Sequence, residues 1–309
     1  MKRIINIVGF VVLIFTTIRF IPIEHRLVDL ASNFVWQLFA VLAVCVVLLL
    51  IARQMKNAIL FALFLAINIS SLLPLYFDNF PDNKDPQPGE KLTLLQANVQ
   101  AINIQYADFF QVVNESNADI IVLQEVNNAW ARQLKQLDIN YPYGAVVTRE
   151  DNFGIAIFSR FLMDARMHKL GKSEFPSLHG TFEFGGKKMN IVASHPPPPV
   201  NDYLYALRND QLGELAVYLN QLFGERILIG DLNTGPWSKY FEKLTAETGM
   251  RDARAGYGVL ATWPASLYFM GIPIDHCLIS NGLRVKSLRI GKNFGSDHLP
   301  LIVQLEMRK

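Results

Sequence analysis

The chain has almost no cysteine. Its 309 residues include only Cys45 and Cys277, and the first of these lies inside a long apolar run. Small proteins that depend on disulfides carry several cysteines at close spacing, so this class is excluded. The fold must therefore be held together by its hydrophobic core.

The chain also lacks a large excess of charge of either sign. It has 29 Lys and Arg residues and 27 Asp and Glu residues, a formal net charge of +2 at pH 7. The first 77 residues contain six basic and two acidic residues, which leaves 23 basic and 25 acidic residues for the remainder. Strong non-specific binding to nucleic acid depends on a basic surface, and the charge of residues 78–309 gives no support for it.

Long apolar runs are abundant, and they are concentrated near the N-terminus. Three of them are Ile4 to Ile23, Phe34 to Ala52 and Asn57 to Phe77. Each is long enough to cross a bilayer of roughly 30 Å as a helix. A helix buried in a soluble core would need a polar face, and none of these runs has one. We therefore predict a membrane anchor with three transmembrane helices over residues 1–77.

The basic residues at the ends of these runs predict their orientation. Lys2 and Arg3 precede the first run, and Arg53 and Lys56 separate the second run from the third. The positive-inside rule places both pairs in the cytoplasm, so three crossings put everything after Phe77 on the outer side of the cell (inner) membrane. A cleaved signal peptide is disfavoured because the first run is too long and no small-residue cleavage pattern follows it.

The pattern changes twice after the third run. Residues 78–91 are polar and rich in Pro and Asp, which predicts a linker. From residue 92, short apolar runs alternate with helical stretches, as in an α/β domain that extends over residues 92–309. The clearest helix is expected from about Tyr203 to Phe223, where leucines recur every three or four residues. The expected strands are Leu92–Val99, Asp119–Leu123, Gly154–Ser159, Lys188–Ser194, Arg226–Ile229, Ile272–Ile279, Arg284–Ile290 and Leu299–Leu305.

Polar side chains with catalytic or metal-binding chemistry follow several of these runs. Loops at one rim of a sheet are where such groups can converge. An Asp-His pair such as Asp297-His298 can bind a hard cation through its carboxylate and take a proton through its imidazole. The six motifs are Gln96-Ala97-Asn98, Leu123-Gln124-Glu125-Val126, Ala193-Ser194-His195-Pro196, Ile229-Gly230-Asp231-Leu232-Asn233-Thr234, Ile274-Asp275-His276 and Ser296-Asp297-His298.

In order and approximate spacing, these motifs resemble those of the endonuclease/exonuclease/phosphatase superfamily. This group of metal-dependent phosphoesterases includes DNase I-like nucleases, apurinic endonucleases, sphingomyelinases and inositol polyphosphate 5-phosphatases. The resemblance covers roughly residues 90–309, and Thr262-Trp263-Pro264 and Pro273-Ile274-Asp275-His276 look like a bacterial membrane-anchored branch. It implies a four-layer α/β sandwich, in which two packed β-sheets are flanked by helices.

The resemblance implies a metal site at Glu125, Asp297 and Asn98. A carboxylate after a buried strand, such as Glu125, is costly unless it is paired, solvated or bound to metal. Carboxylate and amide oxygens suit Mg²⁺ or Mn²⁺ better than zinc, which favours His and Cys. The structural alternatives are a solvated helix cap at Glu125 and a turn residue at Asn98.

The resemblance also implies roles in catalysis for five residues. Asp275 is expected to orient the imidazole of His298, so that the pair helps to generate or position the attacking hydroxide. Asp231 is expected to assist the attacking water, while His195 and Asn233 stabilise charge on the phosphoryl oxygens. The structural alternatives for these residues are ordinary turn and loop positions.

Two other polar residues are predicted to be structural. His276 follows Asp275 and should face the opposite side of the strand, because neighbouring side chains alternate. Arg208 lies in the expected helix between Tyr203 and Phe223, where a solvated position is the ordinary one.

The predicted activity is hydrolysis of a phosphodiester, in nucleic acid or in a phospholipid head group, by metal-assisted in-line attack of water. A phosphomonoesterase acting on a small or lipid-linked phosphate is an alternative, and so is an inactive domain that serves as a membrane-bound binding module. Dinuclear metallophosphatases also use a Gly-Asp signature, but none of the six histidines has the placement which that class needs. The motifs favour no single substrate and no protein partner.

Overall fold

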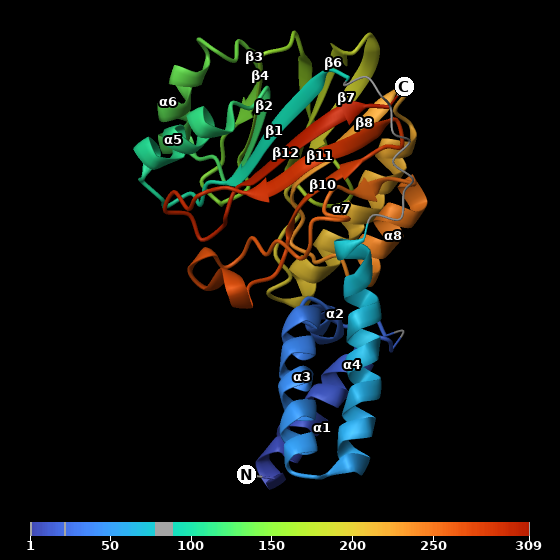
Figure 1. Cartoon of the computed structure of the whole chain (residues 1–309). Helices are drawn as coiled ribbons and strands as arrows, with labels where there is room; N and C mark the ends of the chain where they lie inside the picture. Colours follow the sequence, from blue (N-terminus) through green and yellow to red (C-terminus); the bar gives the residue numbers. More distant parts are fainter. Residues whose placement is uncertain (1, 22, 78–88, 309) are drawn as a thin grey trace.

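The computed structural model describes residues 2–21, 23–77 and 89–308 (Figure 1). Most of the predicted linker, residues 78–91, lies outside the described residues. Lys91 already belongs to the first strand. The described chain forms a bundle of N-terminal helices that projects from one end of an α/β domain (Figure 1).

The N-terminal helices pack through a small apolar core of their own. Helices α1, α3 and α4 lie side by side, and Leu42, Leu49 and Phe61 are fully buried between them. Gly9 permits the close approach of α1, because an added Cβ would lie 1.9 Å from the ring of Phe61. The helices are α1 (Lys2–Ile18), α2 (Arg26–Ser32), α3 (Val35–Ile51) and α4 (Met55–Tyr76).

The prediction of three spanning helices is wrong by length and composition. Among the described residues only α4, with 22 residues and a mean hydropathy of 2.3, passes as a single membrane span. Helices α2 and α3 pass only together, as a pair bent by 65°. Helices α1 and α3 have 17 residues each and are about 26 Å long, short of the roughly 30 Å apolar thickness of a bilayer. The apolar runs are longer than these helices because they continue into the turns.

The α/β domain contains two six-stranded mixed sheets that pack face to face, which confirms the predicted two-sheet architecture. The strand orders are β11-β12-β1-β2-β4-β3 and β5-β6-β7-β8-β10-β9. The first sheet contains β1 (Lys91–Asn98), β2 (Ile120–Gln124), β3 (Tyr143–Val147), β4 (Ile155–Ser159), β11 (Leu283–Ile290) and β12 (Leu301–Met307). The second contains β5 (Asp164–Lys169), β6 (Pro176–Phe184), β7 (Lys187–Ala193), β8 (Glu225–Asp231), β9 (Arg251–Asp252) and β10 (Asp275–Ile279).

Alternation along the strands creates the layers. In β1, Leu92 and Leu94 belong to the core between the sheets, whereas Leu95 and Ala97 pack under the outer helices. The first sheet is covered by α5 (Tyr106–Ser116), α6 (Asn128–Leu134) and the 3₁₀ turn η1 (Lys135–Leu137). The second is covered by α7 (Asp202–Asn220) and α8 (Lys239–Thr248). A further 3₁₀ segment, η2 (Ala265–Met270), precedes β10.

The pairing of four strands prepares one edge of the sandwich for a site. Strands β1 and β2 are parallel, so Asn98 and Gln124 end them side by side. In the second sheet, β8 and β10 are antiparallel, and Asp231 at the end of β8 lies opposite Asp275 at the start of β10. The residues at these four ends come from both sheets and meet at the same edge.

Candidate active site

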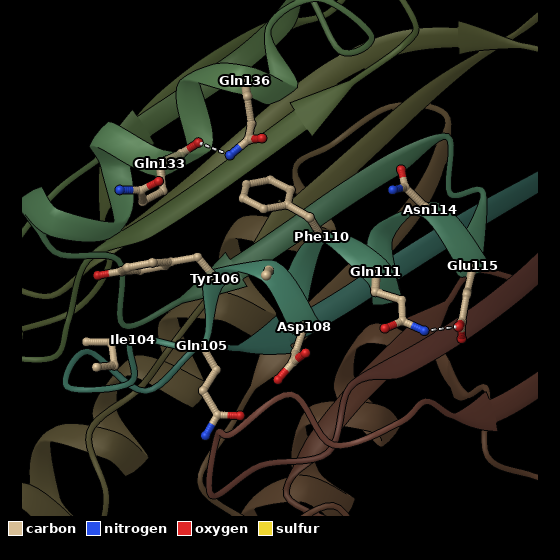
Figure 2. Close-up of a pocket in the computed structure, with 11 residues that line it drawn as sticks. Ile104, Gln105, Tyr106, Asp108, Phe110, Gln111, Asn114, Glu115, Gln133 and Gln136 are labelled. Atoms are coloured by element: carbon tan, nitrogen blue, oxygen red, sulfur yellow. Dashed lines mark hydrogen bonds between the residues drawn. The ribbon is translucent and has the colours of Figure 1, made fainter.

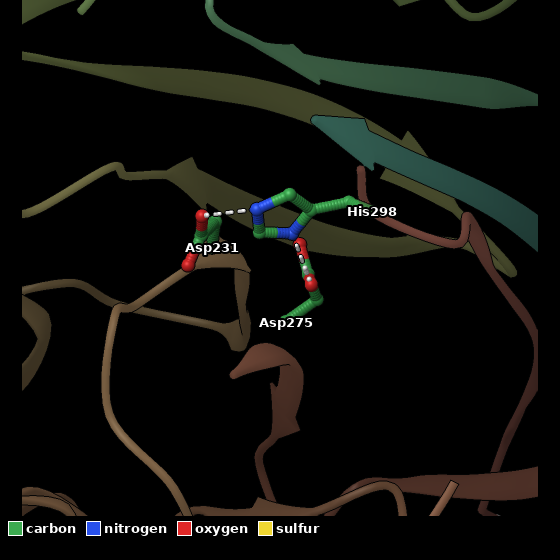
Figure 3. Close-up of side chains that lie close together, drawn as sticks. All are labelled: Asp231, Asp275 and His298. Carbon is green, nitrogen blue, oxygen red and sulfur yellow. Dashed lines mark hydrogen bonds and ion pairs between the residues drawn. The ribbon is translucent and has the colours of Figure 1, made fainter. Parts of the chain in front are cut away.

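The centre of this edge is a histidine held between two aspartates. His298 Nδ1 lies 2.9 Å from Asp275 Oδ2, and its Nε2 lies 3.6 Å from Asp231 Oδ2 (Figure 3). All three side chains are buried. The tertiary fold thus brings together residues from the ends of β8 and β10 and from the loop before β12.

The charges of this group support one another. Burial lowers the pKa of His298, but the carboxylates of Asp275 and Asp231 outweigh this effect and raise it to about 10. Burial raises the pKa of Asp231, but His298 and His195 outweigh this effect and lower it to about 2. The arrangement therefore favours an imidazolium at His298 beside an ionised carboxylate at Asp231.

A residue that sequence reasoning missed supports Asp275. The buried Gln96 donates through Nε2 to Asp275 Oδ1 at 2.7 Å and to Gln124 Oε1 at 2.7 Å. Gln96 lies two residues before Asn98 in β1, so the two side chains share a face of the strand. This two-residue spacing within the first motif could have indicated that Gln96 lies at the site with Asn98.

Asn98 links the two sheets at this edge. Its Nδ2 donates to Glu125 Oε1 at 3.0 Å and to Asp231 Oδ2 at 3.2 Å. Glu125 Oε2 accepts from the backbone N–H of Ala101 at 3.1 Å. Glu125 has φ of 61°, a left-handed conformation that costs a bulky residue on the order of 1 kcal/mol or more and that is common at functional sites.

Asp297 reaches the same edge because its loop is bonded to the end of β1. Ser296 Oγ donates to the carbonyl of Asn98 at 2.7 Å, and the N–H of Asp297 donates to Gln100 Oε1 at 3.2 Å. The half-buried carboxylate of Asp297 accepts from Trp263 Nε1 at 3.1 Å. Asp297 is thereby fixed beside His298 with part of its surface accessible.

The donor set fits a hard divalent cation. Asp231, Asp275 and His298 offer ligand atoms within 4.8 Å of one another. Asp275 and His298 are already paired, however, and the half-buried carboxylates of Glu125 and Asp297 are the more accessible donors. Carboxylate oxygens beside an amide oxygen suit Mg²⁺ or Mn²⁺. Glu125, Asp297 and Asn98, the predicted metal ligands, therefore present oxygen atoms that a hard divalent cation could use.

His195 and Asn233 converge on Asp231 from two loops. His195 Nε2 lies 3.5 Å from Asp231 Oδ2, and its buried Nδ1 has no hydrogen-bond partner among the described residues. Asn233 donates through its backbone N–H to Asp231 Oδ1 at 2.9 Å and through Nδ2 to the carbonyl of Pro196 at 2.9 Å. One N–H of the Asn233 amide remains available to a phosphoryl oxygen.

Gly230 allows the strands carrying these residues to approach. Its φ is 150°, and an added Cβ would lie 2.1 Å from the carbonyl oxygen of Ser194. Only glycine fits between β7 and β8 at this point. The Gly-Asp pair of the sequence motif is thus required by the backbone as well as by the chemistry.

The predicted orientation of His276 is observed, but the predicted position of Arg208 is not. His276 faces away from the site, where its Nε2 lies 2.8 Å from the carbonyl of Thr234 and its Nδ1 lies 3.4 Å from Asp252 Oδ2. The solvated position expected for Arg208 is wrong. Its side chain is fully buried, and its guanidinium pairs with Asp29 of α2 at 2.6 Å. The helical periodicity of α7 could not reveal this partner.

A separate hollow of about 780 Å³ lies between α5 and α6 (Figure 2). Its polar wall includes Gln111, which donates through Nε2 to Glu115 Oε1 at 2.8 Å. None of the predicted site residues lines it, so it is distinct from the edge described above.

Two packed mixed sheets with a buried Asp-His-Asp group and accessible acids at one edge define a metal-dependent phosphoester hydrolase. Residues 95–298 match the model of the Endonuclease/Exonuclease/phosphatase family, and the chain belongs to this family. The protein is accordingly an enzyme that hydrolyses phosphoric esters.

Solved structures share the fold at low sequence identity. The catalytic domain of human nocturnin with bound sulfate is 19% identical, with a TM-score of 0.60, over 72% of this chain and 94% of that one. The endonuclease/exonuclease/phosphatase from Bacteroides vulgatus is 19% identical, with a TM-score of 0.58, over 71% and 100% of the two chains. TDP2 from D. rerio, complexed with a single-strand DNA product, is 17% identical, with a TM-score of 0.56, over 71% and 100%. No curated protein matches the chain by sequence.

Proposed function

We propose that this protein is a membrane-anchored, Mg²⁺- or Mn²⁺-dependent phosphodiesterase. The observation that carries the proposal is the convergence of Asp231, Asp275 and His298 beside the Asn98–Glu125 pair. A bound ion would polarise the phosphoryl group and neutralise charge that develops on it. Glu125, Asp297 and Asn98 would hold that ion.

The remaining residues would act on water and on the phosphoryl oxygens. The ionised carboxylate of Asp231 orients the attacking water and accepts its proton. Asp275 and Gln96 keep the imidazole of His298 directed at Asp231. His195 and the free N–H of Asn233 donate to the oxygens on which negative charge accumulates.

The anchor and its orientation belong to this proposal. Helix α4 is the candidate span, and Arg53 and Lys56 lie at its N-terminal end. The positive-inside rule places these basic residues in the cytoplasm, and the α/β domain, which follows α4, on the outer side. This orientation is the same whether α4 crosses alone or together with the bent pair of α2 and α3.

An exposed apolar segment favours a phospholipid head group as substrate. Leu267, Tyr268, Phe269 and Met270 of η2 are each more than half exposed. Trp36 and Gln37, at the start of α3, donate to the carbonyls of Phe269 and Met270 at 3.3 and 2.7 Å. At the other end of the segment, the N–H of Ala265 donates to the carbonyl of Asp297 at 2.7 Å.

This segment therefore joins the top of the anchor to the candidate metal site. Aromatic and apolar side chains at the level of a membrane interface partition into it. A phosphoester of a membrane lipid would meet the site along this segment. A nucleic-acid phosphodiester is the second candidate, favoured by the TDP2 complex with DNA, and a phosphomonoester is the third.

The test uses the full chain in lipid vesicles, with Mg²⁺ or with EDTA, and with phospholipid, plasmid DNA or a phosphomonoester as substrate. We expect hydrolysis of phospholipid that requires the metal and His298. Replacing both Tyr268 and Phe269 with Ser should reduce hydrolysis in vesicles while sparing a soluble diester. If the plasmid is nicked and phospholipid is not hydrolysed, the site acts on nucleic acid. A folded chain that binds the metal but hydrolyses none of these esters would instead favour the binding module.

A further inference from the structure

Arg208 has a counter-ion that comes from outside the α/β domain. The fully buried guanidinium of this α7 residue donates through Nη2 to Asp29 Oδ2 of α2 at 2.6 Å. Asp29 is buried too, and its Oδ1 accepts from Ser238 Oγ, at the start of α8, at 2.5 Å. A buried charge that loses its partner is strongly destabilising. The α/β domain thus depends on the N-terminal helices to satisfy a cation in its interior.

The same arginine holds the loop that carries two candidate catalytic residues. Residues 231–235, here called the catalytic loop, begin at Asp231, the last residue of β8. Arg208 Nη1 donates to the carbonyl of Asn233 at 3.0 Å. A second bond comes directly from the N-terminal helices, because buried Asn33 accepts through Oδ1 from the N–H of Gly235 at 2.8 Å.

The catalytic loop needs such support. Asn233 has φ of 50°, a left-handed conformation that persists only when the surroundings hold it. Within the α/β domain, Asp231 binds the N–H of Asn233 and His276 binds the carbonyl of Thr234. The N–H of Leu232 also donates to the carbonyl of Ile274. Two further bonds, to the carbonyl of Asn233 and to the N–H of Gly235, depend on α2 and on the residue that follows it.

Further bonds join the N-terminal helices to the α/β domain. Trp237 Nε1 donates to the carbonyl of Ser71 at 2.9 Å, and the N–H of Gly258 donates to the carbonyl of Leu75 at 2.6 Å. These bonds join α4 to segments on both sides of α8. These bonds do not involve α2, so they remain when the side chain of Asp29 or Asn33 is lost.

We propose that Asp29 and Asn33 are positioning residues for the phosphoesterase reaction. Asp29 acts through Arg208, and Asn33 acts through the backbone of Gly235, to hold the catalytic loop in its working conformation. The N-terminal helices thereby complete the active site as well as anchoring it. This inference rests on the proposed function, because it takes Asp231 and Asn233 to act on a phosphoester.

The test compares Asp29→Ala and Asn33→Ala with Asp202→Asn in the full chain. Asp202 is the matched control, because it pairs with Arg26 of α2 at 3.2 Å across the same contact, is 85% exposed and has no bond to the loop. On a soluble phosphodiester, Asp29→Ala and Asn33→Ala should lower kcat roughly 10- to 100-fold, as expected for misplaced groups, and leave KM nearly unchanged. Asp202→Asn should behave as wild type.

A second measurement does not depend on activity. Amide hydrogen exchange of residues 231–235 should be faster in Asp29→Ala and Asn33→Ala than in wild type or Asp202→Asn. Unchanged kcat in both variants of an active enzyme overturns the inference, even if exchange is faster. If the wild type cleaves no phosphoester, the proposed function fails, and unchanged exchange would then overturn the positioning of the loop separately. If Asp29→Ala does not fold, the neutral change Asn33→Ala decides.

Discussion

Two acid–histidine clusters lie on opposite faces of β10, and only one of them contains an arginine. Asp275 faces the edge of the sandwich and pairs with His298, whereas the next residue, His276, faces the other way toward Asp252. Arg254 Nη1 lies 3.1 Å from both Asp252 Oδ2 and His276 Nδ1, so this second cluster has a permanent cation. The first cluster has none among the described residues except the histidine itself.

The two clusters differ in the groups that balance the charge of their aspartates. Both contain a buried histidine and an aspartate whose pKa is lowered to about 2. Burial raises the pKa of Asp252, but the charge of Arg254 outweighs this effect and lowers the pKa. In the cluster of His298, a second aspartate provides charge, and accessible acids lie beside it. Residue type alone therefore does not distinguish a structural cluster from a catalytic one.

The largest effect should come from removing the imidazole of the first cluster. His298→Ala should reduce turnover of the full chain by about 10²- to 10⁴-fold, the usual contribution of a group that assists proton transfer. The stability of the variant is measured as well, because Asp231 and Asp275 lose the imidazole between them. Turnover assays and circular dichroism measure the two effects, with His168→Ala, a change at a half-buried histidine of β5 outside the site, as the control. Retention of more than about a tenth of the wild-type rate would remove His298 from the mechanism.

The second cluster should respond in stability instead. Arg254→Ala leaves Asp252 and His276 without their cation and should lower the free energy of unfolding by about 3–5 kcal/mol. Thermal unfolding of the full chain in detergent measures this loss. If Arg254→Ala abolishes turnover in protein that unfolds at the wild-type temperature, the second cluster is not purely structural, and the contrast between the two clusters is wrong.

The contribution of Asp252 should depend on pH in a defined direction. Its pKa is lowered from 3.8 to about 2 in the folded protein, so the stabilisation is complete above pH 3.8 and lost as the pH falls to about 2. The shift corresponds to about 2 kcal/mol. Unfolding temperatures of wild type and Asp252→Asn should therefore differ near neutral pH and approach each other toward pH 2. A constant difference across this range would show that the carboxylate charge contributes nothing.

The smallest effect is expected at Gln96. Gln96→Leu removes the donor to Asp275 Oδ1, and a hydrogen bond to a charged group contributes about 1.5–3 kcal/mol. Because Gln96 acts through Asp275, we expect turnover to fall less than in His298→Ala, with KM nearly unchanged. Steady-state kinetics of both variants test this order, and a Gln96→Leu enzyme as slow as His298→Ala would contradict it.

Much of the sandwich could be predicted from the sequence. All eight expected strands coincide, within a few residues, with β1, β2, β4, β7, β8, β10, β11 and β12. The missed strands are β3, β5, β6 and β9. Strands β3 and β5 have few buried residues, β9 has only two residues, and β6 contains Pro176 and Gly180. Apolar periodicity identifies strands that bury their side chains, so the edge strands β3, β5 and β9 were missed. Strand β6 lies inside its sheet, but Pro176, Gly180 and polar residues interrupt its apolar pattern.

The candidate site was predictable to a different degree. The motifs identified the acids, amides and histidines that meet at the edge, because each lies at one end of a recognisable apolar strand. Gln96, Asp29 and the burial of Arg208 were missed. Gln96 bonds to Asp275 and Arg208 to Asp29, and each pair is 179 residues apart in the chain. No local pattern records a contact over that distance.

The apolar N-terminal region, the α/β pattern and the kinds of side chain available for phosphoester chemistry are predictable from the sequence. These properties depend on residue type and short-range periodicity. Only the tertiary structure shows that Gln96 bonds to Asp275, that Arg254 pairs with His276, and that α2 reaches the catalytic loop. Such contacts depend on which distant surfaces pack together, and packing is a property of the whole chain.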